Sequence, residues 1–378
     1  MTQLGEKRLS ADNGTSGNGA RARHAPSRNP LSERFISGRN RPTTGWQSAL
    51  ATAAERMGKP GWAPKPSRRE LLERKRQENH AKLLKLTDKV EDRFVLSVFH
   101  FKGGAGKTPV AAYLSCALAQ LTGVPVAFVD GNPGSTSPGM RLGMWGGRER
   151  PSWALTDPPL PGMFRQTATI WQLYDGITSD DESVRISNGR QLQSVMKQNH
   201  YGVSTLVADP DRRGMADSTK LKVVRTAVNF VADNFRFVFI DSGNDFTTST
   251  QQELAVLSTD VLFTAYVKRP EVLNDLRQTI AELSDAKFGD KVERSIVAMS
   301  GIESGKRGGS ASDYAPYIGE FTVASIKGIP YDPIIEHELS VRLDLLQQET
   351  RDALVDILIA VIEQNLRAAG SGSETNGR

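Results

Sequence analysis

The segment from Phe101 to Thr108 reads FKGGAGKT and contains the residue types that hold a chain of phosphates. In such loops glycines let backbone N–H groups close around phosphate oxygens, a lysine reaches the β- and γ-phosphates, and a threonine hydroxyl ligates Mg²⁺. A glycine-rich turn with chance lysines is the alternative interpretation. The residues expected to hold the phosphates and the metal ion are Gly103, Gly104, Ala105, Gly106, Lys107 and Thr108.

The elements on either side suit this chemistry. The apolar run from Phe94 to Phe99 predicts a buried strand, and Val110 to Leu114 predict the start of a helix. A loop between a strand and the amino end of a helix points its amides at a ligand, where the helix dipole favours negative charge. The sequence therefore predicts a nucleoside-triphosphate site with Mg²⁺ beside the phosphates.

Two carboxylates follow later apolar runs. Asp130 comes after Val124 to Val129, and Asp241 comes after Phe235 to Ile240. Ligands of open parallel sheets bind beyond the carboxyl ends of the strands, so we expect both side chains near the phosphate loop. We expect Asp241 to hold Mg²⁺ through water beside Thr108.

In this order and spacing, the motifs resemble the ParA/MinD family of ATPases over residues 94–366. The loop resembles that family's deviant Walker A motif, in which Lys102 matches the additional early lysine. The resemblance implies that Lys102 reaches the partner's nucleotide across an ATP-dependent homodimer; a solvated loop lysine is the alternative. It also implies that Pro330 and Asp332 belong to a loop that packs on the adenine base, with a proline-bounded turn as the alternative.

Two positions depart from the family pattern. Asn132 stands where the family usually has an aspartate that positions the attacking water, and an amide cannot accept its proton. We therefore expect slow, partner-stimulated hydrolysis, or Asp130 in the electrostatic role. Pro109 lacks the N–H that usually donates to the α-phosphate, which predicts weaker nucleotide binding. The catalytic candidates are Lys102, Lys107, Asp130 and Asn132.

From Phe94 onward, strand and helix patterns alternate. This predicts a doubly wound α/β domain with a mostly parallel sheet and helices on both faces. Residues 144–166 predict a long irregular insertion. The expected strands are Phe94–Phe99, Val124–Val129, Ser204–Ala208, Phe235–Ile240, Val261–Tyr266, Ser295–Met299 and Thr322–Ile329, and the expected helices are Thr108–Gln120, Thr219–Asn234, Glu271–Leu283 and Thr350–Leu366.

The 92 residues before this domain carry 19 Lys and Arg against 10 Asp and Glu, although the whole chain has a net charge of only +5. Residues 1–43 have few apolar side chains and predict a disordered basic arm. Residues 44–92 predict a helical extension, in which Ser67 and Glu70 cap a helix from about Arg68 to Leu86. The basic face of that helix is interpreted as solvated, or alternatively as docked on an anionic polymer or a partner. The ATPase domain then covers 93–368, before a disordered tail at 369–378.

The composition, with 38% hydrophobic and 24% charged residues, is typical of a globular protein. No apolar run approaches the roughly 18 residues of a membrane span, and no signal-peptide core occurs, so we expect a cytoplasmic protein without a membrane partner. Cys116 is the only cysteine, which excludes a disulfide framework and a cysteine metal cluster.

Three cellular roles fit these features. In the first, the dimer binds DNA nonspecifically through the basic arm and the Lys306–Arg307 loop, and a ParB-like partner stimulates hydrolysis during DNA partition. In the second, the dimer positions or serves a protein complex such as a type VII secretion system. Residues 45–71 resemble the corresponding region of actinobacterial MinD-like proteins. The third role, a metabolic enzyme, would need a further substrate pocket that the sequence does not identify.

Overall fold

The computed structural model describes residues 66–131, 137–146, 165–212, 214–243, 249–303 and 310–375. Several sequence predictions concern residues outside these ranges. They are the basic arm, the first part of the extension, Asn132, most of the predicted insertion and the Lys306–Arg307 loop.

A seven-stranded sheet with the strand order β5-β2-β6-β1-β7-β8-β9 forms the centre of the molecule. Every neighbouring pair in it is parallel, which confirms the predicted doubly wound α/β architecture. The chain first builds the sheet on one side of β1 and then on the other, so the topological switch point lies at β1. The strands are β1 Phe94–Phe99, β2 Val126–Asp130, β5 Val203–Leu206, β6 Phe237–Asp241, β7 Asp260–Tyr266, β8 Ile296–Ile302 and β9 Ser325–Pro330.

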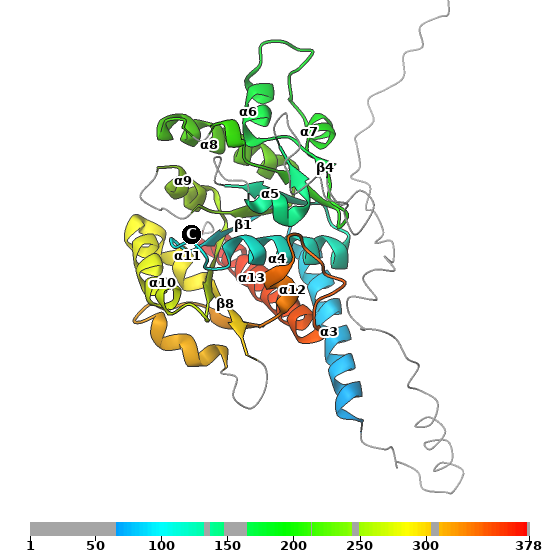
Figure 1. Ribbon diagram of the computed structural model, residues 1–378, viewed down its shortest axis with the longest axis vertical. Helices are drawn as coiled ribbons and strands as arrows, with labels where there is room; N and C mark the ends of the chain where they lie inside the picture. Colours follow the sequence, from blue (N-terminus) through cyan, green and yellow to red (C-terminus); the bar gives the residue numbers. More distant parts are fainter. Residues whose placement is uncertain are drawn as a thin grey trace, which may run out of the picture.

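Helices cover both faces of the sheet (Figure 1). All six residues of β1 are buried, and alternate side chains enter opposite cores, as the two-residue period of a strand requires. Phe94, Leu96 and Val98 join one core, whereas Val95 and Phe99 join the other. The first core is covered by α3 Arg68–Lys89, α4 Lys107–Thr122 and α13 Gln348–Thr375, and the second by α6 Ile170–Thr178, α8 Asp217–Asn234, α9 Ser249–Leu257 and α10 Pro270–Leu283.

The sequence did not predict several shorter helices and strands that the structure contains. A two-residue parallel pair, β3 Met144–Trp145 with β4 Arg165–Gln166, joins the two ends of the segment predicted as an irregular insertion. The 3-10 helices are η2 Pro210–Arg212 and η4 Ala311–Tyr317, and a single π-helical turn, η3, covers Ser284–Phe288. The short α-helices are α5 Ser137–Leu142, α7 Gly189–Val195, α11 Gly289–Arg294 and α12 Pro333–His337.

Helix α13 continues to Thr375, beyond the predicted domain boundary at 368. Its apolar stripe, including Leu354, Ile357 and Leu358, is fully buried in the core that also contains α4. Packing against the α/β domain therefore accounts for the hydrophobic pattern of this helix. Within the ranges that the structure describes, no helix is both long and apolar enough to cross a membrane.

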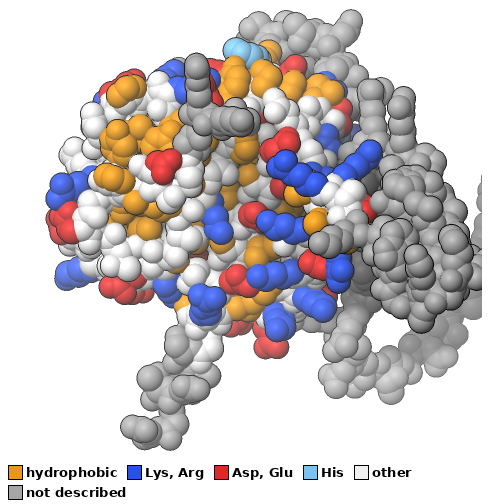
Figure 2. Space-filling view, turned by 90° about the horizontal axis from the view of Figure 1, so that it is seen from below, with side chains coloured by type: hydrophobic (Ala, Val, Ile, Leu, Met, Phe, Trp, Pro, Cys, Tyr) orange, Lys and Arg blue, Asp and Glu red, His pale blue; other side chains and the backbone are white. Residues whose placement is uncertain are grey.

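Helix α3 begins with the predicted capping box. The Ser67 hydroxyl accepts the Glu70 N–H at 3.2 Å, and the Glu70 carboxylate accepts the Ser67 N–H at 2.7 Å. The helix packs along α13, where Arg76 pairs with Asp352 at 3.0 Å and Leu83 is completely buried. Part of its basic face is thus paired with the α/β domain itself. Figure 2 shows further Lys and Arg side chains on the side where α3 lies, interspersed with acidic ones.

Candidate nucleotide-binding site

The loop from Phe101 to Gly106 leaves the carboxyl end of β1 and leads directly into α4. Gly104 and Gly106 have φ angles of +80° and +85°, in the left-handed region that glycine adopts without a steric penalty. The loop therefore wraps around the amino end of α4, where unpaired helix amides and the helix dipole favour an anion. The positive φ angles at these two glycines are a feature of the local sequence.

Lys107 is the first residue of α4 and lies at the bottom of the loop. Its side chain is buried, and its Nζ donates to the Lys102 carbonyl at 3.2 Å. Burial lowers the pKa of Lys107 to about 8, and the opposing effect of Asp241 is smaller. An anionic ligand would favour the charged form of this lysine, as a phosphate-binding role requires.

Thr108 and Asp241 meet as the sequence predicts. The Thr108 hydroxyl donates to Asp241 Oδ2 at 2.5 Å, and the second carboxylate oxygen, Oδ1, is buried without a hydrogen-bond partner among the described residues. Burial raises the pKa of Asp241 to about 6, although Thr108 and Lys107 lower it in part. A hydroxyl and a carboxylate are the oxygen donors that Mg²⁺ uses, so these residues fit a metal ion, which would neutralise phosphate charge here.

Asp130 lies beside Asp241 on the neighbouring strand, because β2 and β6 pair in register at these two residues. Its side chain is fully buried, and Oδ2 accepts the Ala208 N–H at 3.3 Å. It is not among the residues that line the cavity described below. Its catalytic role, like that of Asn132, therefore remains a prediction.

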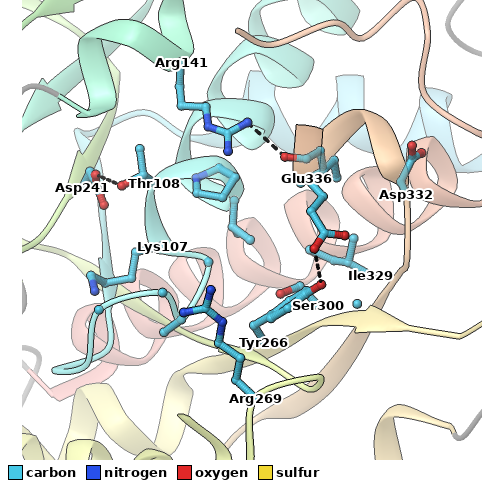
Figure 3. A pocket seen from close by; sticks show the side chains of 18 of the residues that line it. Lys107, Thr108, Arg141, Asp241, Tyr266, Arg269, Ser300, Ile329, Asp332 and Glu336 are labelled. Carbon is cyan, nitrogen blue, oxygen red and sulfur yellow. Dashed lines mark hydrogen bonds between the residues drawn. The ribbon is translucent and has the colours of Figure 1, made fainter. Parts of the chain in front are cut away.

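A cavity of about 410 Å³ opens above the loop and is lined by the predicted site residues other than Lys102, Asp130 and Asn132 (Figure 3). This size suits a nucleotide-sized ligand. One end is formed by the loop, Thr108 and Asp241, and we call it the phosphate end. The other, the base end, comes from four separate segments and is lined by Arg141, Tyr266, Ser300, Gly301, Ile329, Pro330, Tyr331, Asp332 and Glu336.

At the base end, Pro330 and Asp332 both line the cavity, but the Asp332 carboxylate also has a structural role. Its two oxygens accept the N–H groups of Ile334 at 3.0 Å and Gln347 at 2.8 Å. Asp332 is thus the N-cap of α12, and it fixes the turn after β9. The carboxylate shapes the base end through the backbone that it holds.

Sequence reasoning missed several residues of this site. Tyr266 and Ser300 lie at the carboxyl ends of β7 and β8, where the rule for parallel sheets could have found them. Arg141 donates through Nη1 to the carbonyls of Ile335 at 3.0 Å and Glu338 at 2.6 Å, and so ties α5 to α12. No local sequence signal marks Arg141, because its partners lie almost 200 residues away.

His100 is a further residue without a sequence signal. Its Nδ1 accepts the Lys102 N–H at 3.0 Å, so Nε2 carries the proton and donates to the Val272 carbonyl at 3.0 Å. Burial, aided by Lys107, lowers its pKa to about 4. This neutral imidazole joins the front of the phosphate loop to the start of α10.

Lys102 stands apart from the cavity. Its ammonium group pairs with Asp275 of α10 at 2.6 Å, and both side chains are about 40% exposed. The structure therefore gives Lys102 a partner within its own chain. Reach across a dimer interface remains a prediction.

The fold is similar to those of three solved structures. An apo McdA from Cyanothece aligns with a TM-score of 0.50 and 15% identity over 72% of this chain and 99% of that one. A ParA family ATPase from Chlorobium tepidum aligns with a TM-score of 0.49 and 13% identity over 71% of this chain and 99% of that one. MinD from Pyrococcus horikoshii, complexed with Mg-ADP, aligns with a TM-score of 0.47 and 18% identity over 74% of this chain and 98% of that one. No family model and no curated protein matches the sequence. At these identities the similarity shows the fold alone.

Proposed function

Starting from a chain with the P-loop fold of ParA/MinD-type ATPases, we propose that this protein is an ATP-dependent switch that binds Mg-ATP and hydrolyses it slowly. The observation that carries the proposal is the Thr108–Asp241 pair beneath a glycine loop, with Lys107 beside it. One buried carboxylate oxygen of Asp241 has no hydrogen-bond partner among the described residues. Phosphoryl transfer depends mainly on positioning and charge stabilisation, which this arrangement supplies. Asn132 and Asp130 are proposed to orient the attacking water.

The switch is proposed to be an ATP-dependent homodimer that uses Lys102. The Lys102–Asp275 ion pair is half exposed, and such pairs contribute only about 0–1 kcal/mol. The lysine can therefore leave Asp275 at little cost when a second copy brings a nucleotide close. This low cost supports a role for Lys102 in the dimer.

Dimerisation is tested by light scattering after size exclusion, with ATP and with ADP. We expect wild type to form dimers with ATP only and Lys102→Ala to remain monomeric while still binding ATP. Asp275→Asn, which releases the lysine in both subunits, should dimerise at up to about thirtyfold lower concentration, because each dimer breaks two pairs of up to about 1 kcal/mol each. Lys89→Ala, an exposed lysine at the end of α3, is the matched control and should behave as wild type. ATP-dependent dimers of the Lys102 variant would contradict this role.

For the cellular role we propose DNA partition by a cytoplasmic ATPase. The basic arm and the Lys306–Arg307 loop support it, because Lys and Arg supply salt-dependent contacts to phosphates. The test is binding of the full chain to nonspecific duplex DNA, with and without ATP, at 50 and 200 mM salt, conditions chosen on the scale over which such contacts weaken. ATP-dependent binding that weakens steeply with salt is expected. Absence of binding would favour the alternative, a MinD-like ATPase that positions a protein complex or serves a secretion system.

A further inference from the structure

The phosphate end contains a cation that the proposed function has not used. Arg269 lies in the turn between β7 and α10, and its guanidinium points into the cavity (Figure 3). A side-chain carbon built at Gly104 would overlap its Nη1 and lie 3.0 Å from its Cζ. The guanidinium therefore sits directly against the front of the phosphate loop, and a glycine is needed there for space as well as for its φ angle.

The position of Arg269 is fixed by its backbone. Its N–H donates to the Tyr266 carbonyl at 3.1 Å, and its own carbonyl accepts the N–H groups of Val272 at 2.9 Å and Leu273 at 3.3 Å. It is the N-cap residue of α10, followed by Pro270 at the first helical position. Because the backbone provides this cap, the side chain is not needed to hold the helix.

The guanidinium has no hydrogen bond or ion pair with a residue in the described ranges. Lys102, in the same loop, differs, since it is paired with Asp275. The sheet order β6-β1-β7 also places Arg269 across β1 from the Thr108–Asp241 pair. A ligand chain in the loop would thus have the metal ligands on one side and this arginine on the other.

We propose that Arg269 is a clamp for the phosphate chain, which contacts the ligand's phosphate oxygens in the same subunit. The ligand class is a polyphosphate, and the inference rests on the proposed nucleotide site. A planar guanidinium offers two parallel N–H donors to phosphate oxygens, and such charge-assisted bonds are the strong ones. Arg269 thereby supplies donors to a loop in which Pro109 has removed one.

The test measures binding of Mg-ATP by titration calorimetry and displacement of a fluorescent ATP analogue by inorganic tripolyphosphate, which has no base. We expect Arg269→Ala to weaken both ligands by roughly tenfold to a hundredfold, from the worth of a charge-assisted hydrogen bond. Arg269→Lys should recover part of the loss, because it keeps the positive charge but not the two parallel N–H donors of the guanidinium. Arg277→Ala, on the same helix and paired with Glu320, is the matched control and should leave both ligands unaffected.

Wild-type affinity of Arg269→Ala for ATP, to within threefold, would overturn the clamp. Weakened ATP binding with unchanged tripolyphosphate binding would also overturn it, since Arg269 would then act on the nucleoside or on the fold. Thermal melting of each variant separates loss of binding from loss of folding. If the wild-type chain binds no nucleotide, the proposed function itself fails. If the wild-type chain binds nucleotide and the Arg269 variant binds it equally well, only the clamp fails.

Discussion

The two ends of the cavity are built in different ways. Apart from Arg269 and the segment 241–243, the phosphate end consists of consecutive residues, Gly103 to Thr108, whose glycine conformations follow from local sequence. The base end is assembled from four separate segments, held by long-range bonds such as those of Arg141 and Asp332. We infer that the phosphate end provides most of the affinity, whereas the base end mainly selects among nucleotides.

The largest expected effect comes from Lys107→Ala. It removes the buried ammonium group at the bottom of the loop, and hydrogen bonds to charged groups contribute roughly 1.5–3 kcal/mol each. Because Lys107 is expected to contact two phosphates, we predict a loss of ATP affinity of about a hundredfold or more, measured by titration calorimetry. Lys102→Ala, as the control, should bind ATP within about threefold of wild type. A Lys107 variant that keeps a tenth of the wild-type affinity would contradict the assignment of affinity to this end.

The next largest effect concerns His100, which joins the phosphate loop to α10 through hydrogen bonds with Lys102 and Val272. The pKa of His100 is about 4 in the folded chain and about 6.5 in the unfolded chain. Between pH 4 and pH 6.5 the unfolded chain therefore binds a proton at this residue more readily than the folded chain does. The free energy of unfolding is therefore highest above pH 6.5, where His100 is neutral in both states, and it decreases as the pH falls towards 4. Urea unfolding should show a loss of roughly 2 kcal/mol from this residue between pH 7 and pH 5.

His200 provides the matched control for that experiment. Burial also lowers the pKa of His200 to about 4, but its ring lies at a tilt against the Tyr201 ring and outside the cavity lining. Neither ring nitrogen has a partner among the described residues. His100→Gln and His200→Gln should each remove a similar part of the pH dependence. Only His100→Gln should also weaken ATP binding, because the flexible amide does not hold an acceptor for the Lys102 N–H as firmly as the ring does. Equal ATP binding by both variants would show that His100 does not organise the loop.

The same contrast explains how much could be predicted from sequence. All seven strands of the sheet were predicted, to within three residues at each end. Continuous apolar runs, typical of strands buried on both faces, mark central strands such as β1 and β6, whereas the edge strand β9 is only partly buried. The meeting of Thr108 with Asp241 was also predictable, since the carboxyl ends of parallel strands share one edge. Local pattern and one topological rule were sufficient there.

The rest depended on tertiary contacts. Arg141 ties α5 to α12 through a carbonyl on α12, and Arg269 lies against a glycine of the phosphate loop. Neither partner is close to its arginine in sequence. The short helices α5 and α12 have too few residues to show a helical period. Asp332 looked like a base contact, and only the structure shows that its oxygens hold two backbone amides.

A smaller effect tests the departure of this loop from the family pattern. Pro109 is the third residue of α4 and has no N–H to offer a phosphate. Pro109→Thr restores that donor at the phosphate end, and we expect about tenfold tighter ATP binding, since one bond to an anion contributes on the order of 1–3 kcal/mol. Unchanged affinity in a titration would show that the missing amide does not limit binding. Thermal melting of the nucleotide-free variant controls for a change in helix stability.

The smallest expected effect lies at the base end. The Tyr266 hydroxyl donates to Glu336 Oε1 at 3.1 Å across the exposed mouth of the cavity, and such a bond contributes only about 0.5–1 kcal/mol. Tyr266→Phe should therefore change ATP affinity by no more than about fivefold and leave tripolyphosphate displacement unaltered, while it shifts the ratio of ATP to GTP binding. Tyr317→Phe, in η4 and outside the cavity lining, is the control. A large loss of tripolyphosphate binding in Tyr266→Phe would mean that the two ends are coupled, because a hydroxyl at the base end would then be setting the geometry of the phosphate loop.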